Sequence, residues 1–209
     1  MEDSLNSHGL NEVFGDEPAP LPLFQRWIAE AGEAEHDDPT AFALATVDAA
    51  GQPSVRMLLL KGATEAGFVF YTNMNSRKAE ELQGNPRASM CFHWKKLRRQ
   101  LRVSGSVTLV SDAEADAYFA SRDHASKVGA WASLQSSSMS SRGEFEQRVA
   151  ECRTKYPEGS VVPRPPHWSG WLLQPAEVEF WLDADARLHE RLRYTARPDG
   201  SWEQELLYP

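Results

Sequence analysis

Cysteine and long hydrophobic runs are scarce in this sequence, and their scarcity excludes several kinds of protein. The 209 residues include only two cysteines, Cys91 and Cys152, which lie far apart and form no CxxC motif. We therefore expect neither a disulfide framework nor a cysteine zinc site. No apolar run reaches the roughly 18 residues of a membrane-spanning helix, and the acidic residues 1–20 do not resemble a signal peptide. These features predict a soluble protein of a reducing compartment, the cytoplasm, with no membrane partner.

Positive charge is also in deficit. The chain has 22 lysines and arginines against 30 acidic residues, which gives a formal net charge of -8. Binding to a nucleic-acid backbone requires a basic surface, so we expect no nucleic-acid partner. Any bound anion must instead be held by a local cluster of basic side chains.

Several motifs of well-known enzyme classes are missing as well. No GxGxxG follows a predicted strand, no lysine loop of the Walker A type is present, and no GxSxG occurs. The six histidines show no HExxH or other ligand spacing, so we expect no metal. These absences argue against Rossmann, P-loop and α/β-hydrolase enzymes.

The sequence does have the composition and patterning of a folded α+β protein. Hydrophobic residues make up 41% of the chain and charged residues 25%, enough for a sizeable core. A flexible arm over 1–20 precedes a single domain over 21–209. Patterning predicts helices at 20–34, 76–83, 111–122 and 141–156, and strands at 41–48, 53–61, 67–73, 88–94, 98–110, 170–174, 177–182, 187–194 and 202–207. Strands, helices and strands follow in that order, which favours a mainly antiparallel barrel with peripheral helices.

A possible anion site lies in "YTNMNSRKAEE", where a strand ends and a helix begins near Ser76. Arg77 and Lys78 fall in the first helical turn, where cations oppose the helix dipole unless an anion is present. Free N–H groups at a helix start also bind anions, so this pattern suits a phosphate. Alternatively, the segment is an exposed helix start in which basic residues pair with Glu80 or Glu81. From the pattern alone both interpretations stay open.

Two strand segments carry further polar residues. In "RMLLLK", Arg56 and Lys61 have opposite parity on a strand and should face different sides, so a buried strand with charged ends explains them. In "RRQLRVSG", Gln100 can be a surface residue, or it can contact the amide edge of a ring because it offers both a donor and an acceptor.

The segment "ARLHER" places Arg187, His189 and Arg191 at alternate positions. On an extended strand they would form one cationic row with about 7 Å between neighbours. A solvated strand edge could have the same pattern.

Taken in order, five segments resemble the pyridoxamine 5′-phosphate oxidase family. They are "ATVDAAGQPSVRMLLLK", "FYTNMNSRKAEEL", "RQLRVSG", "GAWASLQSS" and "VEFWLDADARLHERLRY", and the resemblance covers residues 20–209. The last segment is close to the family signature, in which Glu-Phe-Trp leads to Arg-Leu-His-acid-Arg. The resemblance implies an FMN-binding split barrel and a homodimer with two flavins at the subunit interface. It also implies oxidation of pyridoxamine or pyridoxine 5′-phosphate to pyridoxal 5′-phosphate with oxygen, a step of vitamin B6 metabolism.

The resemblance further implies which residues bind the flavin. The implied set is Arg56, Met57, Leu58, Leu59, Leu60, Lys61, Tyr71, Thr72, Arg77, Lys78, Gln100, Gln135, Ser136, Trp181 and Arg191. Within it, Arg56, Arg77 and Lys78 would lie closest to the FMN phosphate. Gln135 and Ser136, in the serine-rich segment 133–141, would come from the partner side.

For the substrate, the resemblance implies two groups of residues. The substrate phosphate would be held by Lys61, Tyr118, Arg122 and Ser126. Arg187 and His189 would be the catalytic residues that meet the substrate near its reacting carbon.

The sequence departs from the family pattern at several positions. Ser169 replaces a common second glycine, Leu172 or Leu173 stands where a basic residue is common, and Leu182 follows Trp181 where Gln, His or Gly is preferred. Residues 1–20 contain neither the Arg nor the Tyr that often covers the substrate. Two alternatives therefore remain: a split-barrel flavoprotein with another substrate, or a non-catalytic flavin or pyridoxal-phosphate binding protein.

Overall fold

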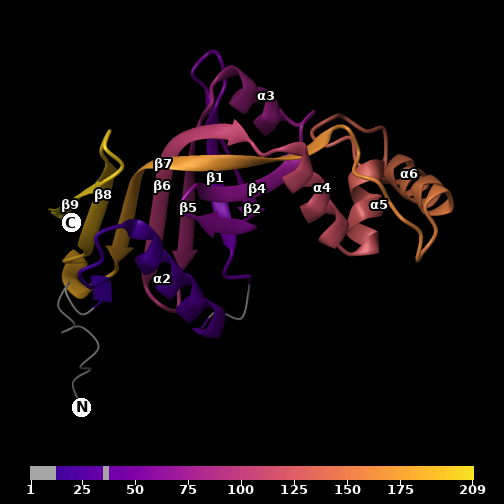
Figure 1. Cartoon of the computed structure of the whole chain (residues 1–209). Coiled ribbons are helices and arrows are strands. Elements are labelled where there is room, and N and C mark those ends of the chain that lie inside the picture. The colour runs from indigo at the N-terminus through magenta and orange to yellow at the C-terminus, as the bar shows by residue number, and fades with distance from the viewer. Residues whose placement is uncertain (1–12, 35–37) are drawn as a thin grey trace.

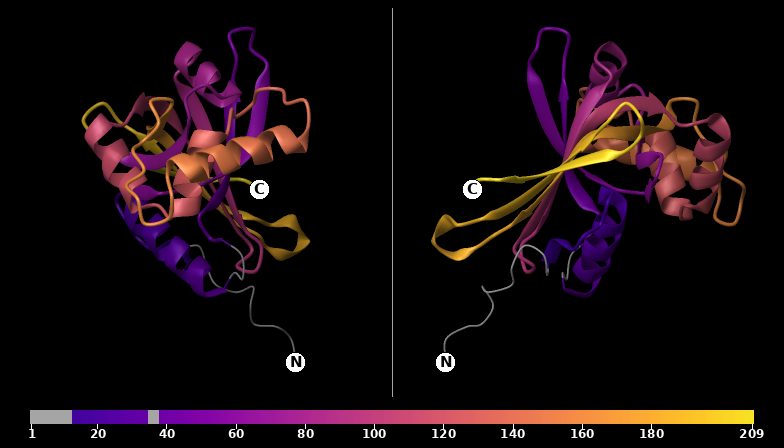
Figure 2. Two further views of the ribbon diagram at one scale, coloured as in Figure 1. Left: turned by 90° about the vertical axis from the view of Figure 1, so that its right-hand side faces the viewer. Right: turned by 60° about the vertical axis from the view of Figure 1, so that its left-hand side comes forward.

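The computed structural model describes residues 13–34 and 38–209, and one nine-stranded antiparallel sheet forms its centre. The strands are β1 (Ala41–Val47), β2 (Pro53–Leu59), β3 (Gly62–Thr64), β4 (Gly67–Asn73), β5 (Arg87–Trp94), β6 (Arg99–Leu109), β7 (Trp168–Leu182), β8 (Glu190–Ala196) and β9 (Trp202–Leu207). Their order is β2-β1-β5-β6-β7-β4-β3, with β8 paired to β7 and β9 to β8. The sheet curls strongly (Figure 2), which confirms the predicted mainly antiparallel α+β class.

Helices occupy the periphery (Figure 1). They are α2 (Pro20–Ala34), α3 (Arg77–Gly84), α4 (Asp112–Ser121), α5 (His124–Ala132) and α6 (Arg142–Lys155), with a short 3-10 helix η2 (Asp185–Arg187). Helices α4, α5 and α6 gather at one end of the molecule, and β8 and β9 lie at the other. No helix within 13–34 and 38–209 is long and apolar enough to cross a membrane.

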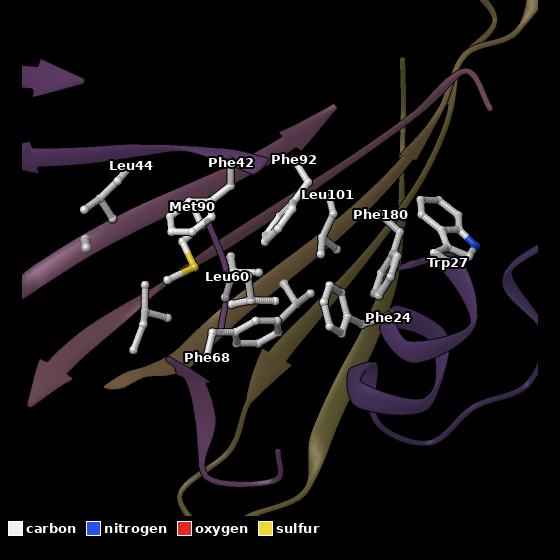
Figure 3. Packing of buried hydrophobic residues seen from close by; sticks show 14 of the residues in the cluster. Phe24, Trp27, Phe42, Leu44, Leu60, Phe68, Met90, Phe92, Leu101 and Phe180 are labelled. Atoms are coloured by element: carbon white, nitrogen blue, oxygen red, sulfur yellow. The ribbon is translucent and has the colours of Figure 1, made fainter. Parts of the chain in front are cut away.

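The main core lies between α2 and one face of the sheet (Figure 3). Leu23, Phe24, Trp27 and Ala31 are buried on α2 at the predicted helical spacing. The Trp27 ring meets Phe180 edge-on with centroids 5.0 Å apart. Full burial of side chains of this size contributes about 1.5–3 kcal/mol each, so this face fixes α2 to the sheet.

The predicted arm falls partly outside the described residues, which begin at residue 13. The part that is described packs against the fold. Phe14 is buried, and the carbonyls of Val13 and Phe14 accept hydrogen bonds from Arg26 on α2. The Tyr194 hydroxyl on β8 donates to the carbonyl of Glu17. Residues 13–19 therefore belong to the packed structure.

Strand pairing gives the sheet two distinct faces. Leu44, Met90, Val103 and Val178 are neighbours across β1, β5, β6 and β7, and all are buried. We call their side the core face. Residues of the opposite parity, such as Glu179 on β7, lie on the outer face, because successive side chains of a strand alternate.

β7 is one continuous strand of 15 residues, where two strands were predicted. The break expected around Pro175 is instead a β-bulge in which the pairing with β6 shifts between Ser104 and Gly105. A Cβ at Gly105 would lie only 1.9 Å from the Gln174 carbonyl oxygen, so glycine is required there. Because β7 has one extra residue, Ala176, the parity of its core face changes from odd numbers to even ones.

The predicted strand over 187–194 is wrong at its start, because β8 begins at Glu190. Ala186 and Arg187 have positive φ angles of 55° and 62°. Left-handed backbone of this kind cannot continue an extended strand. The proposed row of alternating side chains at Arg187, His189 and Arg191 therefore does not exist, and only Arg191 lies in β8.

Helix α5 was not predicted from the sequence. It has nine residues and an internal glycine, Gly129, which weakens the helical pattern. Its start is nevertheless capped, since the Asp123 side chain accepts a hydrogen bond from the Ser126 N–H. The helices predicted over 111–122 and 141–156 are confirmed, and Ser111 and Ser141 cap their starts.

Candidate functional site

Lys78 is the centre of a buried polar group at the start of α3. Its Nζ donates to Thr72 Oγ1 at 3.0 Å, to Ser76 Oγ at 3.2 Å and to Gln135 Oε1 at 2.6 Å. Thr72 lies near the end of β4, and Gln135 lies in the loop after α5. Gln135 was expected from the partner side, but it joins this group within its own chain.

Burial, together with the nearby charge of Arg56, lowers the pKa of Lys78 to about 8, while Glu81 opposes the shift. At neutral pH the ammonium is still charged, although its three hydrogen-bond partners are neutral groups. A buried cation surrounded by neutral acceptors favours an anion close by.

Glu81 binds two arginines next to this lysine. Its carboxylate accepts hydrogen bonds from Arg56 Nη2 at 3.0 Å and from Arg77 Nε at 2.8 Å. Thr46 and Ser54 donate to the same carboxylate, whose side chain is only 3% exposed. Burial alone would raise the pKa of Glu81, but these hydrogen bonds outweigh it and hold the pKa at about 2.

The i to i+4 pairing of Arg77 with Glu81 is thus present, as one of the two interpretations of the helix start predicted. It does not exclude an anion site. Arg77 remains more than half exposed, and α3 presents its N-terminal turn beside Lys78. We call Arg56, Thr72, Arg77, Lys78 and Glu81 the α3 cluster.

An aromatic stack lies between the sheet and α4. The ring of Tyr71 is parallel to those of Tyr118 and Trp168, with centroid distances of 4.1 and 5.1 Å. The guanidinium of Arg122 lies 5.1 Å from the Trp168 centroid. Burial lowers the pKa of Arg122 and raises those of the two tyrosines.

A pocket of about 350 Å³ adjoins this stack. It brings Arg122 and Ser126, predicted for the substrate, together with Thr72 and Gln135, predicted for the flavin. Nη1 of Arg122 is buried and has no hydrogen-bond partner among residues 13–34 and 38–209. An unpaired buried guanidinium N–H is costly, so the pocket favours a negatively charged ligand.

The other predicted residues of this region take different positions. Lys61 is exposed and does not line the pocket. Tyr118 belongs to the stack, and Ser136 lines a neighbouring pocket of about 320 Å³ with the rest of the serine-rich loop. Arg56 and Lys61 face different sides, as their parity predicts. Leu60 is buried in the core on the same side as Arg56, so Lys61, the next residue, points to the other side.

A second cluster lies on the outer face at β7 and β8. Pairing places Gln100 beside Trp181 and Trp181 beside Arg191. Arg191 Nε donates to Glu179 Oε1 at 3.0 Å, and its Nη1 donates to the Tyr208 carbonyl at 2.9 Å. We call Gln100, Glu179, Trp181 and Arg191 the outer-face cluster.

His189 lies against this cluster, with its ring centroid 4.7 Å from that of Trp181. Its Nδ1 is 3.1 Å from Asp183 Oδ1 and 3.2 Å from the N–H of Ala184. One nitrogen cannot accept from the amide and donate to the carboxylate at once, so the amide contact requires a bare Nδ1 and the carboxylate contact requires a proton on Nδ1. Arg187, in η2, is exposed.

The two clusters lie on opposite faces of the sheet. Arg56 is paired with the core residue Leu44 and shares its face, together with Leu58 and Leu60. Gln100 alternates with the core residue Leu101 and so lies on the outer face. Met57 and Leu59, also on the outer face, are exposed. A single ligand therefore cannot contact both clusters of one chain through the sheet.

Three residues with central positions were not assigned a role by the sequence. Glu81 was considered only as an ion-pair partner, Glu179 was part of a motif without a role, and Trp168 ended a proline-rich connector. Signals existed for two of them. Glu179 has the parity of the outer face, where it opposes Arg102. Trp168 is a bulky aromatic residue directly after the rigid segment "PRPPH", which indicates a fixed position.

Family models match two parts of the chain. Residues 28–156 match the model described as pyridoxamine 5′-phosphate oxidase, and residues 168–209 match a pyridoxine 5′-phosphate oxidase C-terminal dimerisation region. A pyridoxine/pyridoxamine 5′-phosphate oxidase of Pelagibacter ubique is 52% identical over 98% of both chains. The protein of the same name from Zymomonas mobilis is 54% identical over 91% of this chain and 98% of its own.

Two solved structures share the fold closely. PhzG from Burkholderia lata 383, in complex with tetrahydrophenazine-1-carboxylic acid, has a TM-score of 0.88 and 32% identity over 95% of this chain and 96% of its own. A pyridoxamine 5′-phosphate oxidase-related, FMN-binding protein from Nostoc punctiforme has a TM-score of 0.74 over 92% of this chain and 100% of its own. At 22% identity it supports the fold alone.

Proposed function

Because the chain belongs to the pyridoxamine 5′-phosphate oxidase family, we propose that it oxidises pyridoxamine 5′-phosphate or pyridoxine 5′-phosphate to pyridoxal 5′-phosphate, with FMN as cofactor and oxygen as acceptor. One observation carries the proposal. Two separate cationic groups, at Lys78 and at Arg122, lie on either side of Thr72 and Gln135. Two neighbouring anion sites suit a reaction in which cofactor and substrate each carry a phosphate.

The α3 cluster suits the FMN phosphate. Lys78, Arg77 and the free N–H groups of the first helical turn would bind its oxygens, and Arg56 would lie behind them. A compact group of this kind favours a terminal phosphate, so we propose FMN rather than FAD. When bound, the flavin supplies the two-electron acceptor for substrate oxidation.

A homodimer explains how the outer-face cluster takes part. Residues 168–209 match the dimerisation region of the family. We propose that the flavin lies between the α3 cluster of one protomer and Gln100, Trp181 and Arg191 of its partner. The exposed apolar side chains of β2, among them Val55 at 68% exposure, lie on the same outer face and would be covered in this dimer.

In this arrangement the substrate phosphate binds Arg122, Ser126 and Tyr118. The pyridine ring then faces the partner's Trp181 side, where His189 and Arg187 act. Nδ1 of His189 lies within hydrogen-bond distance of Asp183, so this pair can hold a proton near the reacting carbon. Lys61 does not line the pocket of Arg122, so its part in holding the substrate phosphate is proposed from the family resemblance alone.

Location and domain structure complete the proposal. Cys91 and Cys152 are free, which agrees with a cytoplasmic location. Residues 21–209 form one domain, since strands from both matched regions share one sheet.

Oxygen uptake by the purified protein tests the function. With pyridoxamine or pyridoxine 5′-phosphate we expect oxygen consumption and formation of pyridoxal 5′-phosphate, and the denatured protein should release FMN and no FAD. Tetrahydrophenazine-1-carboxylic acid, the ligand of the PhzG structure, is the comparison substrate. Turnover of that compound alone would identify a flavoprotein with another substrate. Bound flavin without turnover of any of the three would indicate a binding protein.

A further inference from the structure

Trp168 has a position that none of the predicted roles explains. It is the first residue of β7 and the first residue of the matched C-terminal region, and it is buried. Its ring lies directly beside the pocket of Arg122 and Ser126. Pairing with Asn73 places it next to the end of β4, where the α3 cluster begins.

The contact between Trp168 and Arg122 is a cation–π interaction. The guanidinium carbon lies 5.1 Å from the Trp168 centroid and 5.7 Å from that of Phe119, and the two rings meet edge-on. A planar guanidinium over an indole face loses much of its rotational freedom. The unpaired Nη1 of Arg122 is therefore kept in one place before any ligand arrives.

Trp168 is itself fixed from several sides. Its carbonyl accepts a hydrogen bond from Arg164 Nη1 at 2.8 Å. Arg164 also donates to Asp116 at 2.5 Å and to Asp112 at 2.8 Å, and so ties the connector to α4. Because α4 carries Tyr118 and is followed directly by Arg122, this brace fixes the indole and the guanidinium relative to each other.

We propose that Trp168 is a positioning residue for the substrate-phosphate pocket, which holds the Arg122 guanidinium ready for the phosphate of the ligand. The inference rests on the proposed function for the identity of the substrate. The interaction with phosphate is made equally in the ground state and the transition state. Loss of Trp168 should therefore weaken binding and leave the chemical step unchanged.

Four variants and one control test this role: Trp168→Leu, Trp168→Phe, Arg122→Ala, Trp168→Leu with Arg122→Ala, and Trp131→Leu. Trp131 is a matched control, because it also makes a cation–π contact, with Lys155 5.1 Å from its ring, but Trp131 does not line the pocket. The measurements are KM and kcat for pyridoxamine 5′-phosphate, FMN content, and the Kd values of pyridoxal 5′-phosphate and of unphosphorylated pyridoxal.

For Trp168→Leu we expect KM and the Kd of pyridoxal 5′-phosphate to rise about tenfold. The values for Trp168→Phe should lie between those of the wild type and of Trp168→Leu. The Kd of pyridoxal, kcat and FMN content should stay unchanged, as should all values for Trp131→Leu. In the Arg122→Ala background, Trp168→Leu should raise KM and the Kd of pyridoxal 5′-phosphate little further, since both changes remove the same interaction.

Two results would overturn the proposal. One is that Trp168→Leu raises KM and the Kd of pyridoxal 5′-phosphate by the same factor with and without Arg122. The other is that Trp168→Leu weakens the binding of pyridoxal and of pyridoxal 5′-phosphate equally. If Trp168→Leu does not fold, the same comparisons are made with Trp168→Phe. Failure of the proposed function would look different, because the wild-type protein would then oxidise neither substrate while the titrations with pyridoxal 5′-phosphate still tested Trp168.

Discussion

Two buried glutamates each bind two arginines, but on opposite faces of the sheet. Glu81 accepts from Arg56 and Arg77, and Glu179 accepts from Arg102 and Arg191. The side chains of both glutamates are almost fully buried, at 3% and 4% exposure.

What surrounds the two carboxylates differs. Glu81 also has two hydroxyl donors and is enclosed by β1, β2 and α3 of one chain. Arg102, a partner of Glu179, is about half exposed on the outer face of the sheet. The first cluster is therefore enclosed within a single chain, whereas the second is partly open and would be covered by the other protomer in the proposed dimer.

Among changes to the two glutamates and their partners, Glu81→Ala should have the largest effect on stability. The change leaves Arg56 partly buried without its counter-charge, so we expect the free energy of unfolding of the apoprotein to fall by about 3–5 kcal/mol. FMN should reduce this loss, since its phosphate supplies the missing negative charge. Urea unfolding with and without FMN measures both values. An equal loss in both states would show that no anion binds beside Arg56.

Acid unfolding checks the same residue independently. The pKa of Glu81 is lowered from 4.5 to about 2 in the folded protein, so its contribution is fully present above pH 4.5 and is lost as the pH falls toward 2. The apoprotein should lose stability across this window. Glu81→Ala should lack that part of the loss.

Glu179→Ala should have a smaller effect on stability, about 1.5–3 kcal/mol, because its partners keep access to water. Its effect on function should be the more distinctive one. Released from Glu179, Arg191 would retain its hydrogen bond to the Tyr208 carbonyl, and FMN affinity and turnover should fall together. Flavin content and kcat of the purified dimer measure this. Retention of both would place Arg191 outside the flavin site.

At neutral pH, where the ammonium is still charged, the smallest effect is expected from the titration of Lys78. Its folded pKa of about 8 lies below the ordinary 10.5, so the unfolded chain binds more protons between these values and the stability of the apoprotein rises from pH 8 to 10.5. FMN affinity should show the opposite trend and fall about tenfold per pH unit above 8, because the phosphate needs the ammonium. Lys78→Met should remove both trends in unfolding and flavin titrations. A wild-type affinity independent of pH would separate Lys78 from the phosphate.

The sequence predicts most of the fold because its signals are local. The apolar spacing of α2, the caps of α4 and α6 and the apolar strands all depend on residues close together in the chain. The errors arise where distant residues decide. The bulge that keeps β7 continuous through Pro175 depends on Gly105 of β6, and the left-handed turn at Ala186 and Arg187 interrupts a pattern that otherwise suits a strand.

The candidate site shows the same division. The basic helix start at Arg77 and Lys78 is visible in the sequence, and the structure places it beside Thr72 and Gln135. The stack of Trp168 on Arg122 is not visible, since the two lie 46 positions apart in the chain and no periodicity relates them. Assignments to FMN or substrate remain predictions that depend on the family.

The extra residue in the bulge of β7 determines which way the end of that strand faces. Trp168 and Trp181 are an odd number of residues apart, so on a regular strand they would project from opposite faces. Ala176 restores them to one face. Deletion of that one alanine would turn Glu179 and Trp181 toward the core and Phe180 toward the outer face. The segment should therefore tolerate almost no change in its length.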